Sequence, residues 1–371
     1  MSASCKVIAE AIERLAPLEL AEDWDNVGLL VGSPEHQVTK VLLTLDVTEE
    51  VIDEAVALEA GLIISHHPCL FHPAKNICTD TMTGSLLKKL IKMDMSVYAA
   101  HTNLDVAAGG VNDALAAKMQ LNEVVPLRPV QLPLVKIVTY VPPGHWRTIW
   151  QAMTDAGAGH IGKYSHCGFR VAGKGTFLPG EEARPFIGEP HQLSEVDEIR
   201  LETVAPASIS DRIIRAMIAN HPYEEVAYDI YPLQNSQTAG GMGRVGNLLH
   251  PVTLSEFATR VKELLSLTGV RFVGKSDSLM KRIAVCGGAG AGVAAAARLM
   301  GADVLVTGDI RYHEAMNELA EGLCLIDGGH FGTEFPTMIP LQRYLSACSA
   351  SGGWNCQFFI TQKQSDIWQW I

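Results

Sequence analysis

The chain has 371 residues, of which 47% are hydrophobic and 19% charged, so its composition is that of an ordinary globular protein and excludes a disordered class. Its formal net charge of -12 argues against non-specific binding to the phosphates of DNA or RNA, and no apolar run approaches the length of a membrane span. None of the eight cysteines forms a C-x-x-C pair, which excludes a zinc finger and a thioredoxin-type motif.

The first segment of the chain predicts an amphipathic helix. Ser4 can cap this helix, apolar residues repeat with helical spacing over residues 7–15, and Pro17 ends it. Charged residues lie inside the pattern, so the segment differs from an export signal. We therefore expect a cytoplasmic protein whose cysteines are reduced.

Residues 41–100 alternate between predicted strands and predicted helices. The apolar stretches 41–46, 62–65 and 97–100 are typical of buried strands. Helices are predicted between them, and Thr48 can cap the first of these helices. This alternation indicates a largely parallel sheet that is covered by helices on both faces.

Two breaks in this rhythm predict domain boundaries. The first is a stretch with three prolines over residues 126–133, and the second is the glycine-rich run 240–243. The elements predicted between the breaks follow the order β-α-β-β-α-β, which is that of a ferredoxin-like unit. We therefore predict an inserted α+β domain within a discontinuous core: residues 134–233 as the insertion, and residues 1–130 with 236–371 as the core.

The first rhythm resumes in the last third of the chain. Strands are predicted at residues 283–285, 304–306, 323–326 and 357–360, with helices between them. The predicted fold class is α/β, with a discontinuous, two-lobed core of mostly parallel sheets and the inserted ferredoxin-like domain.

Residues that can bind metals follow three of the predicted strands. His66 and His67 come directly after the strand 62–65, where Pro68 ends the ladder. Ligand sites in open α/β sheets lie beyond the carboxyl ends of the strands, so donors at several strand ends can meet. The other strand ends add three more candidates, of which the last two are four apart on one helix face: Asp105, His330 and Glu334.

These five donors predict a dinuclear metal site. Each residue alone has an ordinary structural explanation, since Asp105 could cap a helix and Glu334 would be favourable in a first helical turn. Together they are too many for one tetrahedral zinc with an open position, and they suit two divalent ions that share a carboxylate and a water. Zinc is the first choice, and manganese, iron, cobalt and nickel stay open.

Other motifs give weaker indications. The run 287–292 resembles a phosphate-binding loop, but its spacing fails at Val293, so close helix–strand packing is the favoured explanation. A helical His-Glu pair at 313–314 lacks the second histidine of a zincin site. The predicted insertion carries the segments 163–167 and 221–225, which could bind a ligand, although packing at turns and edge strands is favoured for both.

Five spaced motifs in this order resemble the Nif-three family of dinuclear metal proteins, whose members carry the name GTP cyclohydrolase I type 2. The motifs span nearly the whole chain: Glu22–Leu29, Ser65–Pro68, His101–Asp105, Thr307–Asp309, and Asp327–His330 with Glu334. The resemblance implies the same five metal ligands, namely His66, His67, Asp105, His330 and Glu334. It further implies that five other motif residues line the cleft: Asp25, Asn26, Asp46, Thr102 and Asp309.

The resemblance also implies an assembly and a reaction. Members with a long insertion are similar to CutA and PII proteins in that segment, and they form toroidal hexamers whose openings the insertions cap. The family name implies that a metal-bound hydroxide attacks C8 of the guanine ring of GTP and opens the ring. We find no basic cluster for a triphosphate, and the nearby residues Lys75, Arg244 and Arg311 are no more than candidates.

The sequence therefore predicts a metal-dependent hydrolase of a small heterocyclic or nucleotide substrate, similar to GTP cyclohydrolase I type 2. The alternative is a non-catalytic metal-binding protein, such as a metal chaperone or a regulatory assembly whose inserted domain senses a ligand. The expected partners are copies of the same chain and a small molecule, with neither nucleic acid nor membrane.

Overall fold

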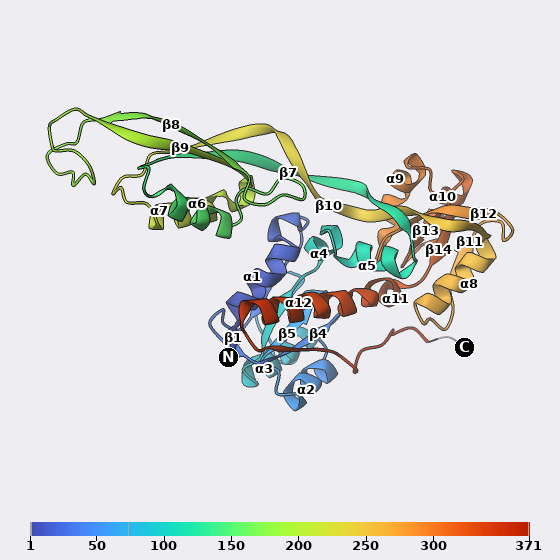
Figure 1. Cartoon of the computed structure of the whole chain (residues 1–371). Coiled ribbons are helices and arrows are strands. Elements are labelled where there is room, and N and C mark those ends of the chain that lie inside the picture. Colours follow the sequence, from blue (N-terminus) through green and yellow to red (C-terminus); the bar gives the residue numbers. More distant parts are fainter. Residues whose placement is uncertain (1, 73, 370) are drawn as a thin grey trace. The chain divides into compact units, whose positions relative to one another are not determined.

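The computed structural model describes residues 2–72, 74–369 and 371, and the chain divides into two compact units. Unit 1 consists of Met1–Val130 and Ala239–Ile371, and unit 2 consists of Gln131–Thr238. Helices and mixed sheets alternate through the chain, so the fold is of the mixed α/β type (Figure 1). Among the helices in the described ranges, none combines the length and apolar character needed to cross a membrane.

The first sheet of unit 1 has the strand order β15-β4-β5-β6-β2. The strands are β2 (Gly28–Val31), β4 (Lys40–Thr44), β5 (Leu62–Ser65), β6 (Ser96–Ala99) and β15 (Gln357–Ile360). The first four strands in the sheet order run parallel, as the apolar runs predict, and β2 pairs antiparallel with β6 at the edge. A small separate sheet pairs β1 (Ala3–Ser4) with β3 (Gln37–Val38).

Helices cover this first sheet because their apolar stripes match its faces. Ile52 of α2 (Glu49–Ala57) and Leu90 of α3 (Met82–Lys92) pack on Leu42 and Ile63 of the sheet. Thr48 caps α2, since its side chain accepts a hydrogen bond from the amide of Val51. The helix α1 (Cys5–Leu15) packs against α12 (Met338–Gly352), which contacts β4 and β15.

The second sheet of unit 1 is mixed. Its strands β12 (Leu279–Val285), β13 (Val304–Thr307) and β14 (Cys324–Asp327) are parallel. They are flanked by two antiparallel neighbours, β11 (Arg271–Val273) beside β14 and β10 (Tyr228–Thr253) beside β12. The prediction of mostly parallel sheets therefore applies to the first sheet better than to the second.

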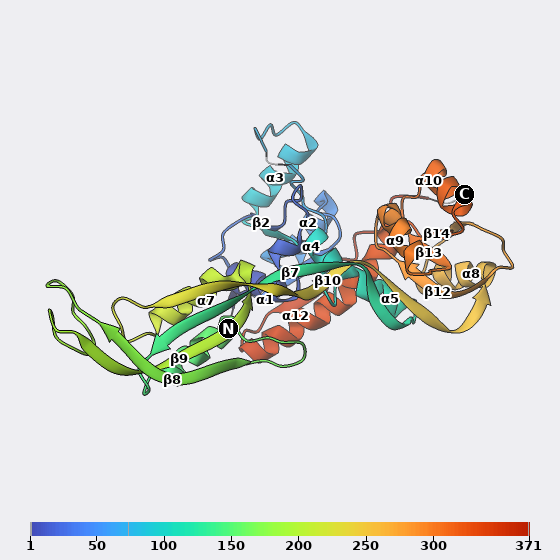
Figure 2. The same ribbon diagram turned by 90° about the horizontal axis from the view of Figure 1, so that it is seen from above.

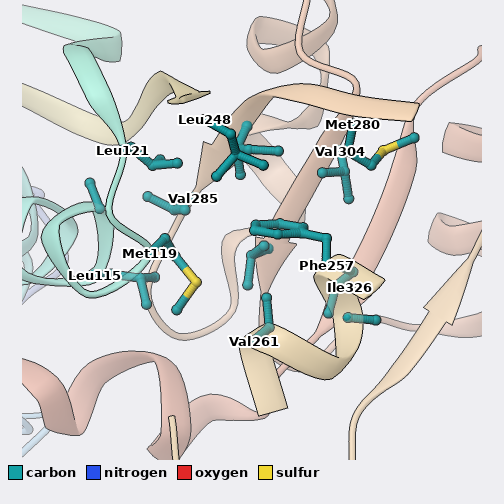
Figure 3. Packing of buried hydrophobic residues seen from close by; sticks show 14 of the residues in the cluster. Leu115, Met119, Leu121, Leu248, Phe257, Val261, Met280, Val285, Val304 and Ile326 are labelled. Atoms are coloured by element: carbon teal, nitrogen blue, oxygen red, sulfur yellow. The ribbon is translucent and has the colours of Figure 1, made fainter. Parts of the chain in front are cut away.

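Side chains of the second sheet alternate between two apolar clusters. On one face Phe257 of α8 (Leu254–Leu264) packs among Val304, Met280 and Ile326, together with α5 (Val111–Lys118), as Figure 3 shows. On the other face Leu305 packs against α9 (Ala294–Leu299), with α10 (Tyr312–Ala320) beside it. The remaining helices are short: α4 (Thr102–Val106), α11 (His330–Glu334) and the 3₁₀ turns Leu18–Leu20, Ala207–Ile209, Gly290–Val293 and Phe335–Thr337.

Two long strands run through the stretches in which the sequence predicts breaks. The prolines at 126, 129 and 133 lie inside β7 (Asn122–Val141), and the glycine run 240–243 lies inside β10. The two strands lie side by side in Figures 1 and 2 and are neighbours in the sheet. A side chain at Gly240 would collide with the carbonyl of Val106, so this glycine serves close backbone approach.

Unit 2 packs two helices on one face of an antiparallel sheet. Strand β9 (Ser194–Pro206) pairs with residues 134–141 of β7 on one side and with β8 (Gly168–Phe177) on the other. Helices α6 (Trp146–Asp155) and α7 (Ser210–Ala219) enclose an apolar cluster with β7 and β9. The elements of this unit follow in the order β7, α6, β8, β9, α7 and β10.

Candidate metal centre

Three strand ends of unit 1 deliver donor side chains to one place. The amide of His66 donates to the Thr44 carbonyl at 3.0 Å, and the amide of His67 donates to the Leu45 carbonyl at 2.8 Å. The ladder with β4 therefore continues past β5 until Pro68. Strand β6 of the first sheet leads into α4, and β14 of the second sheet leads through a glycine turn into α11, so each helix begins at the carboxyl end of its strand.

The carboxylate of Glu334 lies at the middle of the resulting cluster. It is buried, and its oxygens lie 3.0 Å from His67 Nε2, 3.1 Å from His330 Nε2 and 3.7 Å from His66 Nε2. His66 Nε2 is also 3.5 Å from Asp105 Oδ1. The structure thus brings all five predicted ligand residues together.

Three groups in this cluster offer ligand atoms within 4.8 Å of one another, the spacing that a metal ion needs. Two of the groups share Glu334, one with His67 and His330 and the other with His66 and Asp105. The third group joins His66 and His67 to His101, a residue absent from the predicted ligand set. The spacing of His101 and Asp105, four apart at a strand end, is the signal that could have identified it.

Each of the four imidazoles is oriented by a hydrogen bond at Nδ1. His66 bonds to the Ala100 carbonyl at 2.8 Å, and His67 bonds to Asp46 at 2.8 Å. His101 bonds to Asp25 at 2.9 Å, and His330 bonds to Asp309 at 2.7 Å. A carbonyl oxygen can only accept, and an ionised carboxylate likewise, so each Nδ1 is the donor. All four Nε2 atoms are thereby left facing the cluster, which is the arrangement of metal-binding histidines.

The residues predicted to line the cleft stand behind the imidazoles. Asp25, Asp46 and Asp309 are the Nδ1 partners just described. Thr102 donates both its amide, at 3.0 Å, and its hydroxyl to Asp25. Burial by itself raises the pKa of Asp25, but the hydrogen bonds from His101 and from the Thr102 hydroxyl outweigh it and hold this pKa well below its usual range. Asn26 donates to the Leu70 carbonyl at 2.6 Å and fixes the neighbouring loop.

The buried atoms at the centre lack hydrogen-bond partners, and this shortage fits a metal ion. Within the described residues, His66 Nε2 and Asp105 Oδ1 are buried without one, and Glu334 Oε2 lies 3.0 Å from His67 Nε2 but makes no hydrogen bond of adequate geometry. Buried polar atoms in native proteins are rarely left unpaired. Imidazole nitrogen and carboxylate oxygen are the donors that divalent zinc and its neighbours accept, so a cation placed here would satisfy all three atoms.

The pKa values of the histidines and carboxylates in the cluster also show that it favours bound positive charge. Burial by itself lowers the pKa of His67, but Asp46 and Glu334 outweigh it and raise this pKa to about 10. The hydrogen bond from His330 to Glu334 raises the pKa of His330 to about 9, and burial raises the pKa of Asp105 to about 6. Without a metal, protons on the imidazoles neutralise the carboxylates, and a cation can replace them.

The glycine run at 287–292 serves this cluster and leaves few amides for a phosphate. Three of its amides donate to side-chain oxygens: Gly287 to Asn112, Gly288 to Thr333 and Gly290 to Thr307. Gly288 has a φ of +62°, and a side chain there would collide with Glu334 and lie 3.2 Å from His330 Nε2. The run is closely packed, as predicted, but at Gly288 the packing is against the Glu334 and His330 side chains of the site.

Metal binding should strengthen as pH rises. His67 and His330 are protonated in the metal-free protein at neutral pH, because their pKa values lie at about 10 and about 9. Each proton that a metal displaces makes the apparent affinity rise about tenfold per pH unit. Chelator competition between pH 6 and 9 should show this slope with proton release in calorimetry, and a flat profile would contradict it.

Replacing Gly288 should damage the centre while leaving the fold in place. In Gly288→Ala the new methyl group displaces the Glu334 carboxylate, so we expect zinc affinity to fall about tenfold or more. The matched control is Gly292→Ala, because Gly292 has open space around its Cβ position. Equal zinc affinity in the two variants would show that Glu334 tolerates the displacement.

Curated relatives resemble the chain over most of its length. Residues 3–367 match the family Duf34/NIF3 (NGG1p interacting factor 3). The GTP cyclohydrolase 1 type 2 homolog of Bacillus subtilis (strain 168) is 46% identical over 343 residues, which is 92% of each chain. The protein of the same name from Halalkalibacterium halodurans is 44% identical over 329 residues, 88% of each chain.

Solved structures of related proteins also resemble the chain over most of its length. A Bacillus cereus protein related to NIF3 has a TM-score of 0.87 and 42% identity, covering 100% of this chain and 99% of that one. Reduced HcgD from Methanocaldococcus jannaschii, at 21% identity and a TM-score of 0.59, shares the fold. The matches confirm the resemblance to the Nif-three family that the five motifs indicate, and the chain belongs to the Duf34/NIF3 family.

Proposed function

We propose that this protein is a dinuclear, divalent-metal-dependent hydrolase of a small heterocyclic or nucleotide substrate, of the GTP cyclohydrolase I type 2 kind. The observation that supports it most is the set of buried ligand atoms on His66, Asp105 and Glu334 that lack a hydrogen bond. The names of the relatives favour the same class of reaction. Two bound divalent ions would supply an acidified water and polarise a substrate oxygen.

The two donor groups that share Glu334 suggest how the chain would hold two ions. His67 and His330 would hold one ion, and His66 and Asp105 the other, with the Glu334 carboxylate between them. Zinc is the proposed metal, because imidazole and carboxylate are its ordinary ligands. The Nδ1 hydrogen bonds keep the rings turned toward the ions, so the chain itself supplies the orientation.

An exposed aromatic pair beside His101 supports a planar substrate. The rings of Trp24 and Phe71 are stacked with centroids 5.6 Å apart, and they are 55% and 46% exposed. Both rings also lie near the His101 ring, at 6.1 and 6.0 Å. Asn26 ties the two loops together through the Leu70 carbonyl. Exposed aromatic faces stack well on heterocyclic rings, which favours such a ring as the part of the substrate that is recognised.

Two of the three basic residues considered for a triphosphate, Arg244 and Arg311, contribute little to this site. Arg244 is buried and fully engaged, since its guanidinium binds Asp113 and the carbonyls of Ala107 and Gly243. Arg311 is exposed and pairs with Glu314 at 3.2 Å. The proposal therefore defines the substrate by its ring and leaves open how many phosphates it carries.

The reaction can be tested with purified protein of known metal content. Incubation with GTP and other purine nucleotides should produce a pterin-like fluorescent product when zinc, manganese, iron, cobalt or nickel is bound. In Asp105→Ala we expect the loss of at least one metal equivalent and of turnover, with circular dichroism unchanged. The control is Asp277→Ala, which alters an exposed carboxylate outside the cluster.

Two results would contradict this proposal in different ways. No turnover of any heterocycle with two ions bound would leave a non-catalytic metal-binding protein, such as a metal chaperone or regulatory assembly. Unchanged metal stoichiometry in Asp105→Ala would remove Asp105 from the ligand set.

We also propose that the chain assembles with copies of itself, as a hexamer in which a CutA/PII-like, ferredoxin-like unit 2 supports the contacts. The edge strand β8 supports this, because its Phe169 and Val171 are 65% and 47% exposed. These side chains lie on the face opposite Arg170, which packs over Trp146 of α6, so the helices leave them uncovered.

Self-association should depend on this uncovered face. In Val171→Asp we expect a smaller molecular mass by light scattering than for the unaltered protein, since a charge would be buried between copies. The matched control is Ala172→Asp, which places the same charge on the other face of β8. An unchanged mass in Val171→Asp would rule out this face as a contact.

A further inference from the structure

Unit 2 contains a cavity that the metal chemistry does not use. Its volume is about 550 Å³, within the range of roughly 300–1,000 Å³ that small-molecule sites occupy. The end of β8, Glu198 of β9, the segment 178–187 and the motif 221–225 contribute to its walls. That motif is one for which the sequence analysis favoured a packing role.

Aromatic rings form much of the wall. Tyr140, Phe177, Phe186 and Tyr223 all line the cavity. The ring centroids of Phe186 and Tyr223 are 6.3 Å apart, and Phe186 also meets His145 edge-on at 5.5 Å. Such rings bury the apolar part of a ligand, and their faces attract positive charge.

A carboxylate is fixed against this aromatic wall. Glu198 accepts a hydrogen bond from the Tyr223 hydroxyl at 2.9 Å, its one such partner within the described residues. Burial and the Glu198 charge raise the pKa of Tyr223, so Tyr223 keeps its proton and donates. A side chain at Gly175 would collide with the Glu198 carboxylate, so the glycine makes room for it. Most of the acceptor capacity of Glu198 stays free for a ligand.

Two more carboxylates, Glu224 and Glu225, line the same cavity. Glu224 accepts the backbone amide of Arg184 at 2.7 Å, which holds the segment 178–187 against the motif. The lining residues found in the described part of the chain include no lysine or arginine. The cavity therefore combines negative charge with apolar rings.

This combination favours an organic cation over a metal ion. Within the described residues, the groups of three side chains with metal-ligand spacing all belong to unit 1. A metal would also gain nothing from the aromatic wall. An ammonium group carried on an apolar body matches both features.

We propose that this cavity of unit 2 binds a small organic amine, with its ammonium group at Glu198 and its apolar part between Phe177, Phe186 and Tyr223. This cavity is distinct from the proposed metal site, and the proposal does not depend on the proposed hydrolase activity. It assigns a ligand to the motif 221–225 of the inserted segment.

Three probes of one shape and different charge test the site. Calorimetry on the full-length, metal-loaded protein should detect benzylammonium, while benzyl alcohol and benzoate bind at least about tenfold more weakly. Equal binding of the three probes would overturn the proposal. So would the absence of binding by benzylammonium, tetramethylammonium and spermidine alike.

Variants then locate the probe. Glu198→Gln should weaken benzylammonium binding about tenfold or more, and Phe186→Ala, at an exposed position, should weaken it severalfold without affecting folding. The matched control is Glu195→Gln on the same strand, which pairs with Lys174 at 3.9 Å and does not line the cavity. Unchanged affinity in both Glu198→Gln and Phe186→Ala would place the amine elsewhere and overturn the proposal.

Discussion

The arrangement of the histidines in unit 1 depends on the buried carboxylate of Glu334. A carboxylate in a low-dielectric interior is costly unless positive charge or hydrogen bonds surround it. Here three imidazoles approach it within 3.7 Å, and they hold its pKa well below the ordinary value although burial raises it. Those imidazoles in turn need protons or a metal ion. The cluster is thus stable only as a charged assembly with an exchangeable cation.

Holding this assembly requires segments from distant parts of the chain. His67 and His330 are 263 residues apart, yet their Nε2 atoms lie 3.3 Å from one another. The C-terminal segment adds a further support, because Gln364 accepts from the amide of Leu45 at 2.8 Å and donates to Asp46. Since Asp46 orients His67, the far end of the chain helps to aim a metal-facing ring.

The clustering of the five candidate ligand residues could be predicted from the sequence because strand ends are visible as apolar runs followed by polar residues. His66 and His330 are such cases, although the strands before them, β5 and β14, belong to two different sheets, so the rule that places ligand sites beyond strand ends applies to each sheet separately. His101 was not predicted as a metal ligand, because the orientation of its ring depends on Asp25, which lies 76 residues away in the sequence. The full length of strands β7 and β10 could not be predicted, because proline and glycine are local signals, whereas the pairing of these strands is a tertiary contact.

The motif at 221–225 shows the same limit in a different form. A turn that packs an edge strand and a turn that lines a cavity can carry the same residues, and only their neighbours distinguish them. Two neighbours show that this motif lines a cavity. Gly175 has no side chain and so leaves room for the carboxylate of Glu198, which accepts a hydrogen bond from Tyr223. Unit 1 places imidazoles beside its buried carboxylates, and this combination favours a metal ion as the ligand. Unit 2 places carboxylates beside aromatic rings, with no imidazole among the described lining residues, and so favours an organic cation.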